Sequence, residues 1–279
     1  MKKFKNSTAV VTGAGSGIGR ALAINLAHSG ANLALSDINS TELSKTIELI
    51  SYTGVKIHSH PLDVSDRQAF FDYAELIKAE FEEVNLVINN AGVGLNSGSF
   101  EQTTIEEFEW LMSINFSGVL YGTKAFIPIL KQGQWGHIVN ISSLFGIIGV
   151  IGQSAYNASK FGVRGMTESL RQELDASCPS VSCTSVHPGG IKTNIARNAR
   201  TGINLGDGRD NLVLASAEEF DRLASTTADE AAKQILQAVL ANKRRLLIGK
   251  DAKLMDWIQR HFPNNYQRVF NFLANFLTR

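Results

Sequence analysis

A glycine-rich turn near the N-terminus constrains the fold of this chain more than any other feature. The apolar, β-branched run at residues 7–11 leads directly into TGAGSGIG, and the helical pattern RALAINLAHSG follows it. A strand, a glycine loop and a helix in this order form the unit that binds a dinucleotide in parallel α/β sheets. The alternative is a glycine-rich turn without a ligand, which the two flanking elements make the weaker interpretation.

The glycines of this loop have separate physical roles. Gly13 allows a tight turn, Gly17 lets the backbone approach a pyrophosphate, and Gly19 lets the helix pack closely on the strand. The spacing is TGxxxGxG rather than GxGxxG, and Gly15 is an additional glycine. The start of the helix offers free N–H groups and a positive dipole end to phosphates. We therefore expect the loop to bind a cofactor through Gly13, Ser16, Gly17, Ile18 and Gly19.

An acidic residue follows the second predicted strand, at residues 32–36. Asp37 lies about 20 residues beyond the glycine loop, where a carboxylate accepts hydrogen bonds from both ribose hydroxyls of an adenosine. The alternative role for Asp37 is the N-cap of the next helix, but Asn39 and Ser40 are better placed for that.

The same carboxylate would repel a 2′-phosphate. Neither Ser16 in the loop nor Ile38 after the aspartate carries a positive charge that could offset this repulsion. Arg20 lies nearby and is the one cation that could weaken the argument. The sequence therefore favours NAD over NADP.

Further apolar runs alternate with helical patterns along the rest of the chain, at residues 55–61, 85–89, 137–141, 181–186 and 245–248. This alternation predicts an α/β fold with a single Rossmann-type doubly wound parallel sheet of about seven strands, helices on both faces, and C-terminal amphipathic helices. We expect residues 1–250 to form the dinucleotide-binding and catalytic domain. Residues 251–279 would be a helical extension of it rather than a separate domain.

The stretch NISSLFGIIGVIGQSAYNASK carries the candidate chemistry. Tyr156 and Lys160 are four positions apart, so both lie on one face of a helix. An ammonium about 4–6 Å from a phenol favours the phenolate, and a shift of ~3 units from the usual pKa near ~10 corresponds to about 4 kcal/mol. Such a tyrosine could exchange a proton with an alcohol near pH 7, while Ser143 holds the same oxygen. The alternative is a chance pair on a solvated helix face.

Three other segments leave alternatives open. Asn115 is a polar amide among apolar residues of a helix predicted over 104–130, and must find buried partners. The apolar residues of 144–151 could form the wall of a substrate pocket, part of the core, or a subunit contact. The weakly periodic segment 194–225 is typical of a lid or mobile loop.

The tail at residues 251–279 carries two apolar helical stripes separated by Pro263. The first contains Leu254, Trp257, Ile258 and Phe262; the second contains Tyr266, Val269, Phe270, Leu273 and Leu277, widened by Phe272 and Phe276. The tail could make peripheral contact with a membrane surface, cover an apolar substrate channel, pack on a partner subunit, or be an ordinary packed helix.

Composition excludes several classes of protein. Hydrophobic residues make up 44% and charged residues 19%, with a formal net charge of +1, so no basic excess indicates nucleic-acid binding. The longest apolar stretch falls far short of the ~20 residues that span a bilayer.

Cys178 and Cys183 lack metal spacing, and His58 and His60 have no third ligand near them, so we expect no metal site. The lack of a signal peptide and the reduced cysteines favour a cytoplasmic protein.

With these residues in place, the chain resembles a short-chain dehydrogenase/reductase from about residue 7 to residue 249. The resemblance depends on several motifs in the right order: TGAGSGIG (12–19), Asp63-Val64, NNAG (89–92), Asn115, the serine of NISS, YNASK (156–160) and PGGIKT (188–193). It implies a catalytic tetrad in which Tyr156 is the general acid/base and Lys160 lowers its pKa and holds the nicotinamide ribose. Ser143 would bind the substrate oxygen, and Asn115 would anchor a water that links the lysine to solvent.

The resemblance also implies the rest of the cofactor site and the reaction. The cofactor would contact Asp63 and Val64 at the adenine, and Asn90, Ala91, Gly92, Tyr156, Lys160, Pro188, Ile191 and Thr193 along the nicotinamide half. The implied activity is hydride transfer between NAD and an alcohol or carbonyl substrate by a homo-oligomer, and the apolar residues of 144–151, as a possible pocket wall, favour a hydrophobic substrate. The alternative is a catalytically silent dinucleotide-binding regulatory protein or a membrane-peripheral protein.

Overall fold

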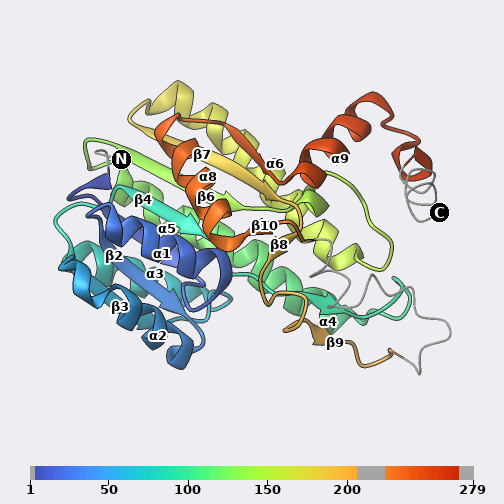
Figure 1. Ribbon diagram of the computed structural model, residues 1–279, viewed down its shortest axis with the longest axis horizontal. Coiled ribbons are helices and arrows are strands. Elements are labelled where there is room, and N and C mark those ends of the chain that lie inside the picture. The colour runs from blue at the N-terminus through green and yellow to red at the C-terminus, as the bar shows by residue number, and fades with distance from the viewer. Residues whose placement is uncertain (1–3, 206–223, 270–279) are drawn as a thin grey trace.

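The computed structural model describes residues 4–205 and 224–269 of the chain, and its centre is one seven-stranded parallel sheet (Figure 1). The strand order is β11-β7-β6-β4-β1-β2-β3, and every neighbouring pair is parallel. The strands are β1 (Thr8–Thr12), β2 (Asn32–Asp37), β3 (Ile57–Pro61), β4 (Leu86–Asn89), β6 (Gly136–Ile141), β7 (Val181–Pro188) and β11 (Arg245–Ile248). The predicted doubly wound sheet of about seven strands is confirmed.

Helices cover both faces of the sheet because side chains alternate along each strand. In β1, Ala9 and Val11 belong to the hydrophobic cluster on one face, whereas Val10 belongs to the cluster on the other. The first face is covered by α1 (Gly17–His28), α2 (Ser40–Ile50) and α8 (Ala228–Leu240). The second face is covered by α3 (Arg67–Glu80), α5 (Gly118–Leu130) and α6 (Ser154–Ser177).

The winding of the sheet reverses between β1 and β4, which places a crevice beyond the carboxyl ends of these two strands. From β1 the chain builds outward through β2 and β3, and then returns to build β4, β6, β7 and β11 on the other side. Such a reversal separates the crossover loops and leaves room for a ligand between them. The predicted glycine loop and the NNAG motif lie at this point.

The helix predicted over residues 104–130 is divided in the structure. It consists of α4 (Ile105–Met112), a π-helical turn (Ser113–Ser117) and α5. Thr104 begins α4 with a capping box, in which its hydroxyl accepts from the Glu107 N–H and the Glu107 carboxylate accepts from the Thr104 N–H. The π turn places Asn115 at the point where the helix widens, and such turns are frequent at functional sites.

Four short strands were not predicted from the sequence. β5 (Leu95–Asn96) pairs in parallel with β9 (Arg200–Thr201), and β8 (Ile191–Lys192) pairs with β10 (Thr226–Thr227). Each has only two residues, so period-2 alternation gives no signal in the sequence. Two 3₁₀ turns, η2 (Ser51–Thr53) and η4 (Leu144–Gly146), also occur in the described ranges.

The C-terminal helix α9 (Lys250–His261) packs against the apolar segment that follows Ser143. Leu144, Ile147 and Ile148 are buried in one cluster with Ala252 of α9, and Tyr266 packs against the same cluster. Of the alternatives left open for this segment, packing in the core describes Leu144, Ile147 and Ile148, whereas Phe145 lines the cavity described below. The part of the second predicted stripe beyond Val269 lies outside the described residues, as do positions 206–223 of the predicted lid.

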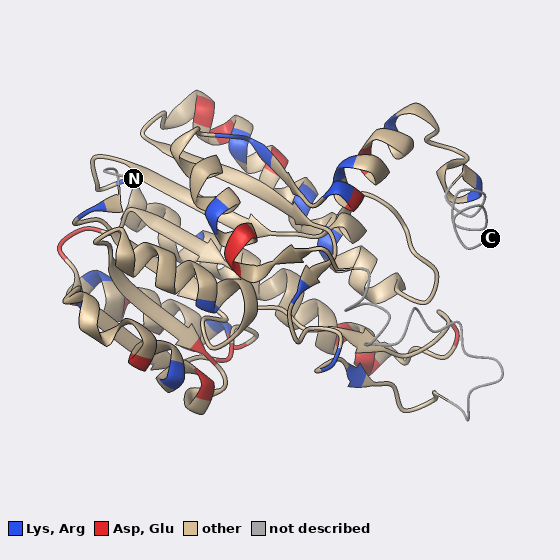
Figure 2. Cartoon of the chain, in the orientation of Figure 1, with Lys and Arg blue, Asp and Glu red and all other residues tan. Residues whose placement is uncertain are grey.

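Charged residues lie mainly on the helices and loops, and the strands of the main sheet carry few of them (Figure 2). Among the described helices, none combines the length and the apolar character needed to cross a bilayer.

Candidate active site

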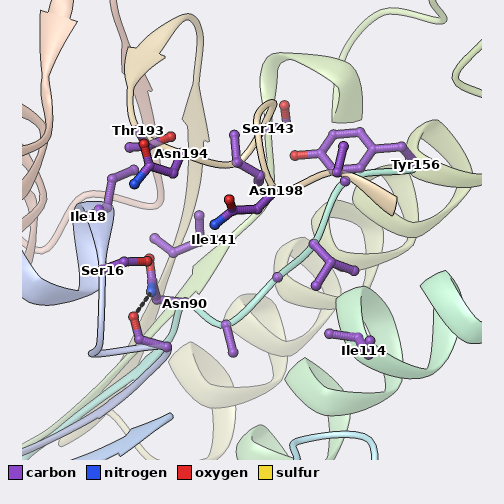
Figure 3. A pocket seen from close by; sticks show the side chains of 18 of the residues that line it. Ser16, Ile18, Asn90, Ile114, Ile141, Ser143, Tyr156, Thr193, Asn194 and Asn198 are labelled. Carbon is purple, nitrogen blue, oxygen red and sulfur yellow. Dashed lines mark hydrogen bonds between the residues drawn. The ribbon is translucent and has the colours of Figure 1, made fainter. Parts of the chain in front are cut away.

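A cavity of about 670 Å³ lies beyond the carboxyl ends of the strands (Figure 3). Loops that follow β1, β2, β3, β4, β6 and β7 all contribute to its lining. Every residue predicted for the site lines this cavity except Gly19 and Asn115, which lie behind its wall. The segments that carry the sequence motifs therefore meet at one place.

The glycine loop has the backbone that the sequence argument required. Gly13 and Gly17 have φ values of +65° and +49°, a conformation that favours glycine. A Cβ at Gly19 would collide with the carbonyl oxygen of Gly13, and one at Gly17 would lie 3.1 Å from Cγ2 of Thr193. The loop is thus bare on the side of the cavity, and the N-terminus of α1 opens towards it with Ser16 and Ile18 in the lining (Figure 3). This bare cradle fits a pyrophosphate.

Asp37 at the end of β2 closes the glycine loop on its other side. Its Oδ2 accepts from the N–H of Gly15 at 2.8 Å, and its Oδ1 accepts from the N–H of Asn39 at 2.9 Å. Asn39 is the N-cap of α2, because its side chain accepts from the N–H of Glu42, so the alternative role of Asp37 as the cap is excluded. Asp37 remains in the lining of the cavity.

Arg20, the one nearby cation that could weaken the argument for NAD, is paired with an acidic side chain. Arg20 forms an ion pair with Glu42, with an N···O distance of 2.8 Å, and donates to the hydroxyl of Thr46. It also donates to the carbonyl of Gly15. The charge of Arg20 is therefore balanced by Glu42, and its N–H donors are engaged by Glu42, Thr46 and the carbonyl of Gly15.

Asn90 connects the loops after β1 and β4. Its side-chain amide donates to the carbonyls of Thr12 and Gly13 at 2.9 and 3.2 Å. The hydroxyl of Thr12 accepts from the N–H groups of both Asn90 and Ala91 at 3.1 Å. Sequence reasoning missed this role of Thr12, although a threonine at the end of the first strand, opposite the NNAG motif, could have indicated it.

The loop after β3 and the turn after β7 complete the walls. Asp63 accepts from the N–H and the hydroxyl of Ser65, and Val64 is buried against Gly118. The N–H of Gly190, in the turn that also contains Pro188 and leads to Ile191 and Thr193, donates to Asp251 of α9 at 2.6 Å. The C-terminal helix therefore supports this wall from behind.

Ser143, Tyr156 and Lys160 gather at the inner end of the cavity. Lys160 is 3% exposed, its Nζ donates to the carbonyl of Ile141 at 3.1 Å, and it lies 5.6 Å from the ring centroid of Tyr156. Tyr156 points its hydroxyl into the cavity on the side of Ser143, which hydrogen-bonds to it (Figure 3). The three groups predicted from the sequence therefore meet in space.

The pKa of the tyrosine shifts in the direction opposite to the one expected. Burial raises the pKa of Tyr156 above its usual value, and the hydrogen bond from Ser143 offsets only part of that rise. Burial also lowers the pKa of Lys160 to about 8. The sequence argument considered the attraction between the two groups and left out the cost of removing both from water, which is the larger effect here.

Asn115 lies at the π turn and is fully buried. Its Oδ1 accepts from the N–H of Val93 at 2.8 Å, and its Nδ2 donates to the carbonyl of Val93 at 2.9 Å. A Cβ on Gly92 would lie 3.2 Å from this Oδ1 and 3.4 Å from Nζ of Lys160. The amide therefore holds the NNAG loop beside the lysine. Its implied role in anchoring a water stays a prediction.

Several lining residues carried no sequence motif. They are Val93, Gly94, Leu95, Asn96, Trp110, Ile114, Phe145, Gln153, Asn194, Ile195, Ala196, Asn198 and Ala199. The predicted lid over 194–225 and the possible pocket wall over 144–151, which contains Phe145, pointed to part of this set. The remaining members lie on segments whose composition is that of an ordinary helix or loop, so pattern alone could not find them.

The two histidines that were considered as a metal pair lie in a row of stacked rings with Tyr73. His58 and His60 have ring centroids 6.4 Å apart, and His60 stacks on Tyr73. No cluster of three or more histidine, cysteine or acidic side chains suited to a metal ion occurs in residues 4–205 or 224–269.

Comparison with known proteins now adds to this geometry. The family model described as short chain dehydrogenase matches residues 7–204. The chain belongs to the short-chain dehydrogenase/reductase family. It is 46% identical over 270 residues to the SadH protein of Mycobacterium tuberculosis, covering 96% of this chain and 95% of that protein.

Two further relatives extend the comparison. A cyclohexanol dehydrogenase from an Acinetobacter species is 34% identical over 191 residues, covering 68% of this chain and 75% of that protein. A crystal structure of a short-chain dehydrogenase/reductase from Burkholderia phymatum in complex with NAD is 28% identical. It covers 94% of this chain and 95% of that chain, with a TM-score of 0.84.

Proposed function

We propose that this oxidoreductase transfers hydride between NAD(H) and a hydrophobic secondary alcohol or its ketone. The observation that carries the proposal is the meeting of Ser143, Tyr156 and Lys160 at the inner end of a cavity whose outer end is the glycine loop. A bound nicotinamide would accept the hydride from the alcohol carbon or return it to the carbonyl carbon. The protein then needs only to move one proton at the oxygen and to stabilise the charge on it.

The side chains at the inner end fit these tasks. The hydroxyl of Ser143 can donate to the substrate oxygen while the phenol of Tyr156 exchanges the proton with it. With its pKa raised by burial, Tyr156 is a phenol at neutral pH and is ready to protonate an alkoxide. Lys160 is positively charged below about pH 8 and favours the phenolate that remains after proton transfer.

The preference for NAD depends on Asp37. Its carboxylate lies in the cavity lining, where it can accept from ribose hydroxyls, and the nearby Arg20 is paired with Glu42. An additional phosphate on the ribose would therefore meet a negative charge without a free cation from Arg20 beside it. The relative crystallised with NAD supports the same choice.

The substrate class follows from the lining near Tyr156. Leu95, Trp110, Ile114, Phe145 and Ile195 supply apolar surface, whereas the acidic lining residues Asp37 and Asp63 belong to the cofactor half. A neutral, apolar alcohol or ketone loses no charge hydration on entering such a compartment. The named activity of the cyclohexanol dehydrogenase relative agrees with this class.

The test is a cofactor-reduction assay with alcohols of rising chain length and ring size, using NAD and NADP in parallel. Tyr156→Phe should reduce turnover by about 10²–10⁴-fold, because it removes the general acid/base, while NADH binding measured by fluorescence titration is retained. Unchanged turnover in this variant would refute the proposed role. A wild-type protein that binds NADH but oxidises none of the alcohols and reduces none of the ketones would favour the catalytically silent alternative.

Assembly and location are part of the same proposal. We expect a cytoplasmic homo-oligomer, which light scattering coupled to gel filtration would test for the oligomeric state. Peripheral membrane contact through residues 251–279 is the competing use of the tail, and liposome flotation with and without these residues tests it. The exposed side chains of Leu254 and Trp257 support a surface role for α9, whereas its buried Ala252 and Ile258 support packing on the body.

A further inference from the structure

The carboxylate of Glu107 is buried, yet the proposed chemistry does not use it. Glu107 lies in α4 and is 1% exposed. Its Oε2 accepts from the N–H of Thr104 at 3.0 Å, which completes the capping box. Its Oε1 accepts from the N–H of Ile203 at 2.7 Å, across 96 positions of sequence. A helix cap does not need this second contact, so it calls for another explanation.

The contact to Ile203 fastens one wall of the cavity to another. Five residues between positions 194 and 199 line the cavity, and residues 93–96 line it next to them: a Cβ on Gly94 would lie 3.1 Å from Cβ of Ala199. β9, just before Ile203, pairs with β5: the N–H of Arg200 donates to Gly94 at 3.1 Å, and the N–H of Gly202 donates to Asn96 at 2.7 Å. Glu107 binds the first N–H beyond this pairing.

Further contacts join the same two segments, residues 94–97 and residues 200–203, and we call the contact between these segments the seam. The guanidinium of Arg200 lies 5.0 Å from the ring centroid of Trp110, which itself lines the cavity. A Cβ on Gly202 would lie 2.6 Å from Cα of Ser97, so the two segments touch along their backbones. The side chain of Asn204 donates to the carbonyl of Gln102 at 3.1 Å. The seam is continuous, and Glu107 is its buried charged member.

We propose that Glu107 is a positioning residue of the substrate compartment: its carboxylate holds residues 200–203 against residues 94–97, and the strength of that hold sets the affinity for the alcohol. The inference rests on the proposed dehydrogenase function. A buried carboxylate that has lost one of two hydrogen-bond donors is strongly disfavoured, so Glu107 favours the closed seam. If the seam opens, only the closed fraction binds substrate, and the apparent dissociation constant rises by the inverse of that fraction.

Glu107→Gln tests the proposal with a minimal change of shape. An amide offers one acceptor oxygen and one NH₂ donor, so it can accept from Thr104 or from Ile203 but presents a donor to the other N–H. The matched control is Glu106→Gln, which removes the same charge from an exposed neighbour. A second control is Thr104→Ala, which removes the cap hydroxyl of α4 and keeps the contact between Glu107 and Ile203.

The first readout is amide hydrogen exchange of the peptides that contain residues 200–203, which needs no activity. We expect exchange about tenfold faster in Glu107→Gln and unchanged in the two controls, because only that variant loosens the seam. The second readout is steady-state kinetics with NAD and cycloalkanols of rising ring size. We expect KM for the alcohol to rise about tenfold, equivalent to about 1.4 kcal/mol, with kcat and the Kd for NADH within twofold of wild type.

The outcomes are distinct. Unchanged exchange and unchanged KM in Glu107→Gln, with an active wild type, overturn the inference and leave the dehydrogenase function intact. A KM rise of equal size in Thr104→Ala also overturns it, because Glu107 would then act only through the helix cap. If the wild-type protein binds NADH but turns over none of the cycloalkanols, that result counts against the proposed function. The exchange measurement still decides whether Glu107 holds the seam.

Ile203→Pro approaches the same contact from the other side, because proline has no N–H to donate. It should reproduce the faster exchange and the KM rise, and the double variant with Glu107→Gln should be no worse than either single variant. This variant also carries the test if Glu107→Gln fails to fold. Additive effects of the two substitutions would contradict the proposed pairing.

Discussion

His187 at the end of β7 gives the sharpest prediction on stability. It is fully buried, its Nδ1 lies 3.1 Å from the carbonyl oxygen of Ser143, and its Nε2 lies 3.0 Å from the hydroxyl of Ser185. A carbonyl only accepts, so Nδ1 carries the proton and Nε2 accepts from the serine. Burial lowers the pKa of His187 to about 3, and Arg245 and Arg164 act in the same direction. The imidazole is therefore neutral in the folded protein.

The sign and size of the effect follow from proton linkage. The unfolded chain binds a proton at this histidine below its ordinary pKa of 6.5, whereas the folded protein does so only near pH 3. Between these values the unfolded state binds more protons, so the free energy of unfolding falls as the pH falls. With these two pKa values, lowering the pH from 7 to 5 removes about 2 kcal/mol of stability through His187 alone.

The assay is urea unfolding of wild type and His187→Asn at pH 7 and pH 5. Asparagine can still donate to the carbonyl of Ser143 but does not titrate. At pH 7 we expect the variant to be less stable by about 1–3 kcal/mol, because it loses the contact to Ser185 and leaves a space. At pH 5 the difference between the two proteins should shrink by about 2 kcal/mol. His261→Asn, at an exposed position of α9, is the matched control.

The reasoning would be refuted by a stability difference that is the same at both pH values. That result would mean that His187 has the same affinity for protons in the folded and unfolded states, which is incompatible with a buried imidazole that donates to a carbonyl. A difference that grows at pH 5 would reverse the sign and would place a carboxylate, rather than a serine hydroxyl, next to the ring.

Other predictions concern the site itself. Asp37→Ala should lower kcat/KM for NAD about 10–100-fold more than for NADP, measured with both cofactors, because it removes a charged acceptor for the ribose. Asn115→Ala should lower the free energy of unfolding by about 1–3 kcal/mol in urea titrations, because it leaves the N–H of Val93 unpaired. Rate profiles should show alcohol oxidation rising with pH above neutrality, whereas ketone reduction should stay level and fall only in strongly alkaline solution, since burial raises the pKa of Tyr156 above its usual value. Tyr266→Phe should change kcat less than twofold, because its hydrogen bond to Gly149 is exposed.

The sheet and the cofactor half of the site could be predicted because their signals are local in sequence. Most strands of the main sheet are short, largely apolar runs, and the motifs of the cofactor half directly follow strands. In parallel sheets the carboxyl ends of all strands lie at one edge, so the order of motifs along the chain already implies that they meet. This rule alone predicted that Gly13, Asn90 and Ser143 lie at one site.

The remaining features could not be predicted because they depend on pairs of residues far apart in sequence. Nothing near Glu107 indicates that its second acceptor would bind Ile203, and nothing near His187 indicates that it would hold the backbone of Ser143, 44 positions away. The sequence left the role of the apolar run after Ser143 open because its partner, Ala252, belongs to a tail whose docking has no sequence signal. The direction of the Tyr156 pKa shift was wrong for the same reason, since desolvation depends on the packing of the whole site.

This difference in construction has a functional consequence. The cofactor half is held by bonds between strand-end loops, such as those of Thr12 and Asn90, and these loops open only if the sheet itself is disturbed. The substrate half is closed by a two-residue strand pair, the carboxylate of Glu107 and a few side-chain contacts, so we expect it to open at a smaller free-energy cost. Substitutions along the seam should therefore change which alcohol is accepted and how tightly, while hydride transfer at Tyr156 continues at its own rate. A change of seam residues that altered NADH affinity as strongly as alcohol affinity would show that the two halves are not separable in this way.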